Sequence, residues 1–196
     1  MGGGAGKADL AAGRAITPAT VFDIASNSRQ FTADAILLLA GRHRLALDDP
    51  LSAHLDRPPA WTRNVTPADL MHHTSGIPDY EELLHAKGVE LTDPAGQQDA
   101  VKAILATRPA DPSGRRFSYS HSNYVLRAHA VERVSGKPFA TFVQQEFFDP
   151  LRRRMALAPA ADVPGKARSY EEKDGSFTPP GPPPGRSTET GSRRER

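Results

Sequence analysis

A serine and an arginine three positions later, Ser26 and Arg29, stand directly before an apolar stretch of the chain. Residues three apart lie on the same face of a helix, and a helix N-terminus favours developing negative charge. This spacing indicates a nucleophile with a basic neighbour, as used in covalent catalysis. A serine in this position is also typical of an N-cap before an ordinary core helix, so the pair alone leaves both interpretations open.

The helix that Ser26 would precede is predicted from the spacing of its apolar residues. Phe31, Ala35 and Leu39 recur four positions apart, which places them on one face of a helix over about residues 28–42. Residues 20–24 favour a short strand and residues 117–121 a short strand or loop, so we predict a largely helical chain with few strands. Further helices are predicted at residues 67–72, 97–107, 122–134 and 139–148.

Charge and composition exclude several classes of protein. The 196 residues carry a net charge of only +2, so we predict no nucleic-acid partner, and the basic cluster at residues 152–154 is too small to form such a surface. Cysteine is absent, which excludes disulfides and a thiol nucleophile. The adjacent His72 and His73 would point about 100° apart on a helix and would not share one ion, so we predict no metal site.

Neither a signal peptide nor a membrane span is expected in this sequence. The first ten residues lack a basic start followed by an apolar run. The longest apolar run, residues 35–40, is far shorter than a bilayer requires.

The composition changes abruptly near residue 171. From there the chain is dense in Pro, Gly and Arg and has almost no apolar residue to bury. Such a segment cannot offset its ordering entropy by burial. We therefore expect one domain over residues 1–170 and a disordered tail over residues 171–196.

Three stretches follow one another in the order and spacing of a known family. They read FDIASNSRQFTADAILLLAGRHRLALDDPLSAHL, VTPADLMHHTSGIPDY and FSYSHSNYVLRAHAVERVSGKPF. Over about residues 6–170 the chain resembles the serine beta-lactamase and penicillin-binding-protein-like hydrolases, which include D-alanyl-D-alanine carboxypeptidases and related esterases. The resemblance implies the α/β (α+β) fold of beta-lactamases and transpeptidases, and enzymes that often work in the periplasm or outside the cell.

The resemblance also implies roles for four residues. Ser26 matches the nucleophile of the family's Ser-x-x-Lys element, and Arg29 stands in place of the lysine. A guanidinium is effectively never deprotonated, so Arg29 would supply positive potential without acting as a base. Tyr119 matches the tyrosine of the Tyr-x-Asn element, where it relays a proton, and His121 stands in place of the asparagine. An imidazole there could donate a hydrogen bond or act as a base, or His121 could merely fill space.

The family's third element, Lys-Thr-Gly or a His-x-Gly variant, has no match in this sequence. The strands that come before residue 6 in the family are also missing, so we expect an incomplete fold, truncated at both ends, that is mainly the helical region. Two functions follow. One is a serine hydrolase of impaired activity that forms an acyl-enzyme through Ser26 with a beta-lactam, a D-Ala peptide or an ester. The other is a non-catalytic relic or binding module. We expect no cofactor, a small-molecule or peptide substrate for the hydrolase, and leave the oligomeric state open.

Overall fold

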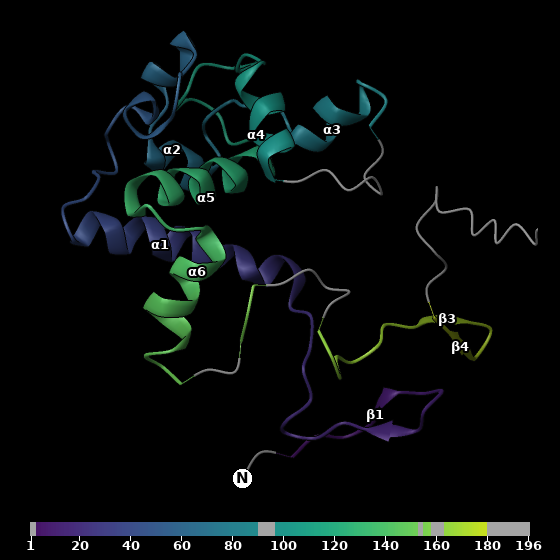
Figure 1. Ribbon diagram of the computed structural model, residues 1–196. Helices are drawn as coiled ribbons and strands as arrows, with labels where there is room; N and C mark the ends of the chain where they lie inside the picture. The colour runs from purple at the N-terminus through teal and green to yellow at the C-terminus, as the bar shows by residue number, and fades with distance from the viewer. Residues whose placement is uncertain (1–2, 90–96, 153–154, 158–162, 180–196) are drawn as a thin grey trace, which may run out of the picture. The chain divides into compact units, whose positions relative to one another are not determined.

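The structure, a computed structural model, describes residues 3–89, 97–152, 155–157 and 163–179 (Figure 1). The chain forms two compact units. In its described part the smaller unit combines residues 3–23 with residues 164–179. The larger unit contains residues 24–89, 97–152, 155–157 and 163.

The smaller unit joins two segments that are far apart in the sequence. Its antiparallel pairs are β1 (Lys7–Asp9) with β2 (Arg14–Ala15), and β3 (Glu171–Lys173) with β4 (Ser176–Thr178). Asp9 connects the segments, because its carboxylate accepts a hydrogen bond from Tyr170 Oη at 3.1 Å and lies 3.1 Å from Arg168 Nε. These contacts hold the smaller unit together despite its very short strands.

Residues 171–178 differ from the sequence-based expectation of a disordered tail. They form the β3–β4 hairpin, in which Gly175 provides the positive φ of 77° that a tight turn requires. The hairpin is exposed along its whole length, so it satisfies its backbone without adding to a core. Residues 180–196 of the expected tail, and residues 153 and 154 of the basic cluster, lie outside the described residues. The domain division at residue 171 stays a prediction.

The larger unit is helical throughout its described part. No described helix combines the length and hydropathy that crossing a bilayer requires. The α-helices are α1 (Gln30–Gly41), α2 (Pro67–His72), α3 (Tyr80–His85), α4 (Gln97–Leu105), α5 (Ser122–Ser135) and α6 (Phe139–Val143). Short 3₁₀-helices lie at Ala25–Arg29 (η1), Leu51–His54 (η2) and Ala60–Asn64 (η3), and a π-helical turn, η4 (Gln144–Phe148), follows α6.

The helix α5 lies at the centre of this unit, in contact with α1, α2, α4 and α6 (Figure 1). Val131 faces a cluster of fully buried side chains that includes Ile36 of α1 and Val143 of α6. Leu126, one to two turns earlier, faces a second cluster with Leu70 of α2 and Ile104 of α4. Because α5 contributes to both clusters, its N-terminal end is held firmly.

Most predicted helices are confirmed, and local capping chemistry explains where α2 begins. In α2, Asp69 N donates to Thr66 Oγ1 at 3.1 Å and Thr66 N donates to Asp69 Oδ2 at 2.9 Å, which is a complete capping box. The helix predicted from residue 28 begins instead at Gln30, because the 3₁₀ turn of η1 precedes it. The sequence pattern did not predict α3, a six-residue helix with a single fully buried residue, Leu84.

The turn at residues 73–76 follows α2 and is hydrogen-bonded to the segment that precedes α5. Ser118 N donates to His73 O at 2.8 Å, and Ala110 N donates to Gly76 O at 2.8 Å. Gly76 has a φ of 69°, and a Cβ at this position would lie 2.2 Å from Asp111 O. The close backbone approach therefore requires glycine at position 76.

We predict that Gly76→Ala destabilises the protein by about 2–5 kcal/mol. A left-handed backbone costs a non-glycine residue about 1–2 kcal/mol, and the clash with Asp111 O adds roughly 1–3 kcal/mol. The matched control is Gly136→Ala, since Gly136 has a similar φ of 75° but open space around its Cβ position. Urea unfolding of both variants measures the difference, and equal losses of stability would show that the close approach is unimportant.

Candidate active site

Ser26 lies in η1, directly before α1, and is exposed to solvent. Ala25, the preceding residue, has a φ of 44°, and backbone strain of this kind clusters at functional sites. Ser26 does not cap a helix, because Ile24 is the N-cap of η1 and Arg29 that of α1, neither with a side-chain cap bond. The interpretation of Ser26 as an ordinary N-cap is therefore wrong.

Arg29 connects the turn that carries Ser26 to the start of α5. Its guanidinium carbon lies 5.4 Å from the ring centroid of Tyr119 and 4.7 Å from that of Tyr124. Both distances are within the range of a cation–π interaction. The side chain of Arg29 thus brings the turn that carries Ser26 into contact with the segment that carries Tyr119. All three residues were predicted from the sequence.

Tyr119 is an exposed ring held by aromatic contacts. It is 47% exposed, and it stacks on His73 with ring centroids 4.7 Å apart and an angle of 24° between the planes. His121 meets it edge-on at 5.4 Å. These contacts orient the phenol and leave part of it open to an incoming molecule.

A series of buried hydrogen bonds around His73, the residue that stacks on Tyr119, determines the tautomer of His73. Asn123 Nδ2 and Ser120 N both donate to His73 Nδ1, at 2.9 and 3.3 Å. Asn123 Oδ1 in turn accepts from Ser75 Oγ at 2.6 Å, which assigns the orientation of the amide. His73 Nε2 therefore carries the proton and donates to Tyr124 Oη at 2.9 Å.

The environment of His73 favours its neutral form. Burial lowers the pKa of His73 below its usual range, and the positive charges of Arg127, Arg29 and His121 lower it further. His72, its neighbour in sequence, is exposed. The two histidines lie in different environments, His73 buried and His72 exposed.

Arg127 is a second cation in this cluster that the sequence reasoning missed. It is buried on α5, and its guanidinium carbon lies 4.2 Å from the ring centroid of Tyr124. Burial lowers the pKa of Arg127 to about 10, which still leaves it charged at neutral pH. Arg29 and Arg127 both lie against Tyr124, so the cluster has a strongly positive potential. A single arginine in a helical pattern carries no signal of burial, and only the packing reveals it.

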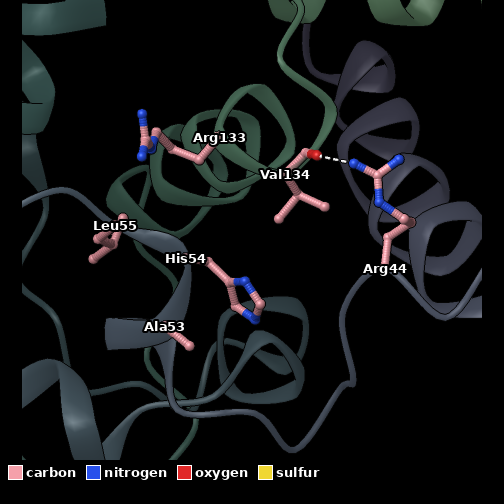
Figure 2. A pocket seen from close by; sticks show the side chains of 6 residues that line it. All are labelled: Arg44, Ala53, His54, Leu55, Arg133 and Val134. Atoms are coloured by element: carbon pink, nitrogen blue, oxygen red, sulfur yellow. Dashed lines mark hydrogen bonds between the residues drawn. The ribbon is translucent and has the colours of Figure 1, made fainter.

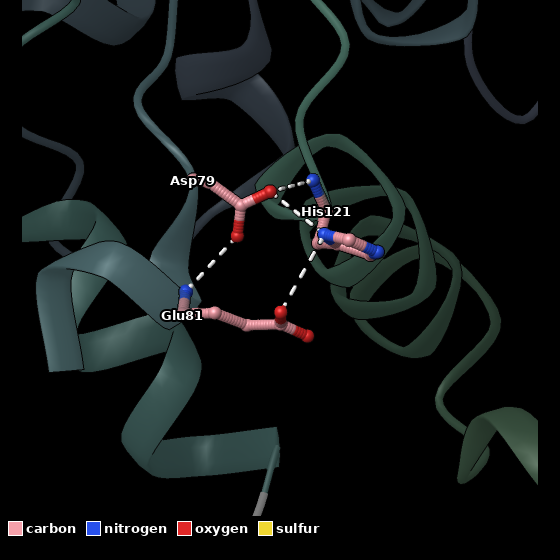
Figure 3. A group of neighbouring side chains, drawn as sticks. All are labelled: Asp79, Glu81 and His121. Atoms are coloured by element: carbon pink, nitrogen blue, oxygen red, sulfur yellow. Dashed lines mark hydrogen bonds and ion pairs between the residues drawn. The ribbon is translucent and has the colours of Figure 1, made fainter. Parts of the chain in front are cut away.

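His121 is bound to Asp79 at the start of α3 (Figure 3). Asp79 Oδ2 accepts from His121 N at 2.8 Å and lies 2.7 Å from His121 Nδ1. Asp79 Oδ1 accepts from Glu81 N at 3.0 Å. Burial raises the pKa of Asp79, but these hydrogen bonds outweigh burial, so the net pKa of Asp79 is lowered and the carboxylate is charged at neutral pH.

Asp79, Glu81 and His121 are also residue types that can bind a metal ion. One ligand atom each of Asp79, Glu81 and His121 lies within 4.8 Å of the others. The 2.7 Å separation of Asp79 Oδ2 and His121 Nδ1 is that of a hydrogen bond, and both carboxylate oxygens already accept backbone N–H groups. Hydrogen bonding thus accounts for the group, and the absence of a metal site stays a prediction.

A surface pocket lies away from the candidate residues (Figure 2). Arg44 donates there to the backbone oxygen of Val134 across the pocket. None of the predicted catalytic residues contributes to its lining, which consists of Arg44, Ala53, His54, Leu55, Arg133 and Val134.

Comparison with known proteins places the chain in a family. The family model described as Beta-lactamase matches residues 2–192. The chain belongs to the beta-lactamase family. Its members are serine hydrolases, so the family predicted from the three motifs is confirmed.

Among the relatives of this beta-lactamase-family chain is a D-aminopeptidase of Brucella canis, 32% identical over 174 residues. The alignment covers 85% of the chain and 32% of the relative, so the chain spans about a third of the relative's length. A second relative, Protein flp of Staphylococcus aureus, is 30% identical over 145 residues, which are 69% of the chain and 27% of the relative.

Two solved structures share the fold. A penicillin-binding protein from Bacillus halodurans has a TM-score of 0.76 and 31% identity, and 89% of the chain matches 54% of it. The octameric penicillin-binding protein homologue from Pyrococcus abyssi has a TM-score of 0.73 and 26% identity, with coverage of 89% and 42%. The predicted fold class is confirmed: the chain is a helix-rich part of the beta-lactamase and penicillin-binding-protein fold.

We predict that the protein loses stability as the pH falls through about 6.5, and that His73 contributes to this loss. The pKa of His73 is lowered in the folded state, so below its usual value of about 6.5 the unfolded chain binds a proton that the folded chain does not. The loss continues until the folded pKa is reached. Urea unfolding at pH 7.5 and pH 5.5 measures it.

The variant His73→Asn is expected to lose less stability over this pH interval than the wild type. His72→Asn, which replaces the exposed neighbour, is the control and keeps the wild-type dependence. If His73→Asn and His72→Asn have the same pH dependence, burial of His73 is not its cause.

Proposed function

We propose that this chain is a serine acyl hydrolase of reduced activity, with Ser26 as the nucleophile. Ser26 Oγ attacks the carbonyl carbon of an amide or ester, and Tyr119 Oη takes its proton and passes it to the leaving group as the C–N or C–O bond breaks. Water then hydrolyses the acyl-enzyme. The observation that supports this best is the contact of Arg29, three residues after Ser26, with the ring of Tyr119, because it joins the nucleophile's helix to the proton relay.

The charge of the cluster suits the chemistry of acyl transfer. A tetrahedral intermediate carries a negative charge, and preorganised positive groups stabilise it most where water is excluded. Arg29 and Arg127 are two such groups, and the N-terminus of α1 adds the positive end of its dipole. Arg29 cannot accept the proton of Ser26 as an amine would, and we attribute the reduced activity to this.

We infer the substrate class from the relatives. A D-aminopeptidase and a penicillin-binding protein match the chain at 32% and 31% identity. We therefore propose short peptides or amides with a D-residue at the scissile bond as substrates, with beta-lactams and simple esters as alternative acyl donors.

A second candidate is a non-catalytic member of the family that binds such peptides without cleaving them. The observations that favour it are Arg29 in place of lysine and His121 in place of asparagine. General acid–base catalysis is typically worth about 10²–10⁴ in rate, so loss of the amine base alone would suppress turnover strongly. Acylation of Ser26 distinguishes the two candidates.

We expect Ser26 to become acylated when the full chain is incubated with a fluorescent penicillin or a p-nitrophenyl ester. Mass spectrometry of proteolytic fragments locates the adduct, and release of D-Ala from D-Ala-p-nitroanilide reports on peptide-type substrates. Ser26→Ala is the control that removes the nucleophile. A wild type that carries no adduct and equals Ser26→Ala in turnover would contradict the hydrolase and support the binding protein.

We predict that Arg29→Lys raises the acylation rate of Ser26, by up to about 10² if the restored amine acts as a general base. Arg29→Gln is the control, since it removes the charge without supplying a base and is expected to acylate more slowly than the wild type. Stopped-flow fluorescence of the penicillin adduct measures all three rates. An unchanged rate in Arg29→Lys would show that residue 29 does not limit the reaction.

A further inference from the structure

We propose that Asp79 is a positioning residue that holds His121 as the Nδ1–H tautomer, so that His121 Nε2 is the base for hydrolysis of the acyl-enzyme. The deacylation step rests on the function proposed above, whereas the tautomer does not. Asp79 lies in the second of the three family stretches, but the sequence assigned it no role, because its contact with His121 spans 42 residues.

Two backbone hydrogen bonds fix the carboxylate of Asp79 independently of the imidazole. It is the N-cap of α3, where it accepts from Glu81 N, and it also accepts from His121 N at the start of α5. Its side chain is only 15% exposed. Beside it, Ser122 Oγ donates to Pro78 O at 2.6 Å. The pairs Asp79–His121 and Pro78–Ser122 thus connect the starts of α3 and α5, and the carboxylate of Asp79 has little freedom to rotate away from His121.

This fixed carboxylate determines which nitrogen of His121 carries the proton. A carboxylate only accepts hydrogen bonds, so the 2.7 Å contact with Asp79 Oδ2 requires a proton on Nδ1. Glu81 Oε2 is 3.9 Å from Nδ1, too far for a hydrogen bond. In Figure 3, Nδ1 faces the two carboxylates and Nε2 points away from them. Nε2 of the neutral ring is therefore an acceptor.

The surroundings of His121 suit a base that works on water. Its side chain is 29% exposed, so water can reach it, and its ring lies nearly perpendicular to that of Tyr119 in the candidate active site, with centroids 5.4 Å apart. A histidine whose Nδ1–H is held by a carboxylate is the arrangement used by hydrolases in which Nε2 moves the proton. His121 thus occupies the position of the family's asparagine with a group that can also take up a proton.

Hydrolysis of an acylated Ser26 proceeds by addition of water and then loss of the serine oxygen. The oxygen of water bonds to the acyl carbon while His121 Nε2 takes a proton from the water. The bond between the acyl carbon and Ser26 Oγ then breaks, and the imidazolium returns its proton to Oγ. Asp79 stays ionised throughout and stabilises the imidazolium.

The tautomer is measured by long-range ¹H–¹⁵N correlation spectra of the uniformly ¹⁵N-labelled full chain, with the His121 signals assigned by their loss in His121→Gln. We expect a protonated Nδ1 and an unprotonated Nε2 at pH 8. Asp79→Asn keeps a good helix cap but lacks the ionised acceptor, so the Nε2–H form should become populated. Glu81→Gln is the matched control and should leave the spectrum of His121 unchanged. A wild type with the proton on Nε2, or the same spectrum in Asp79→Asn, overturns the positioning role.

Single-turnover kinetics with the fluorescent penicillin test the step itself. Asp79→Asn and His121→Gln should slow deacylation about 10²-fold while acylation of Ser26 changes much less, and Glu81→Gln should behave as the wild type. Equal slowing of both phases would assign His121 to acylation and overturn the deacylation role. If Ser26 is never acylated, the proposed function fails together with the deacylation role, and the tautomer still decides whether Asp79 positions His121.

Discussion

The buried hydrogen bonds that fasten the start of α5 to residues 73–79 are the constraint on which the candidate active site depends. His73 and Asn123 are almost fully buried, and a buried polar group without a partner costs roughly 1–3 kcal/mol or more. The series Ser75–Asn123–His73–Tyr124 satisfies these groups in turn. Because each partner determines the next, the network allows one arrangement of the rings that surround Tyr119.

Gly76 makes that network possible. Its left-handed backbone and missing Cβ allow the chain to pass close to Asp111, so the segment leading to Tyr119 can pair with the turn. Meanwhile α5 packs into both hydrophobic clusters through Leu126 and Val131. The position of the site is therefore set by the core of the larger unit, and the aromatic and charged side chains follow from it.

Positive charge distinguishes this site chemically. The guanidinium of Arg29 lies against two aromatic faces, and we propose that it takes the position of an amine that could exchange a proton. Arg127 adds a second charge below Tyr124. In the function proposed above, these groups stabilise the anion of the intermediate, while Tyr119 and His121, with its partner Asp79, move the protons. Stabilisation of charge and movement of protons are divided between different side chains.

Much of the larger unit could be predicted from local sequence. Helical spacing of apolar residues and the capping box of Thr66 and Asp69 indicated α1, α2, α4, α5 and α6 to within a few residues. The 3₁₀ form of the turn before α1 was not predicted; it occurs together with a positive φ at Ala25, a residue whose type gives no sign of it. Nor was the β3–β4 hairpin, whose residues have the composition of a disordered segment.

The sequence by itself determined the family and the helical character, because motif spacing along one chain is a local property. It also predicted four candidate site residues, Ser26, Arg29, Tyr119 and His121. Only the tertiary structure decided which partners these residues have. The tautomer of His73 depends on Asn123, 50 residues away, and that of His121 on Asp79, 42 residues away. Where a proton resides is set by the group on the far side of the hydrogen bond, and folding alone brings that group into place.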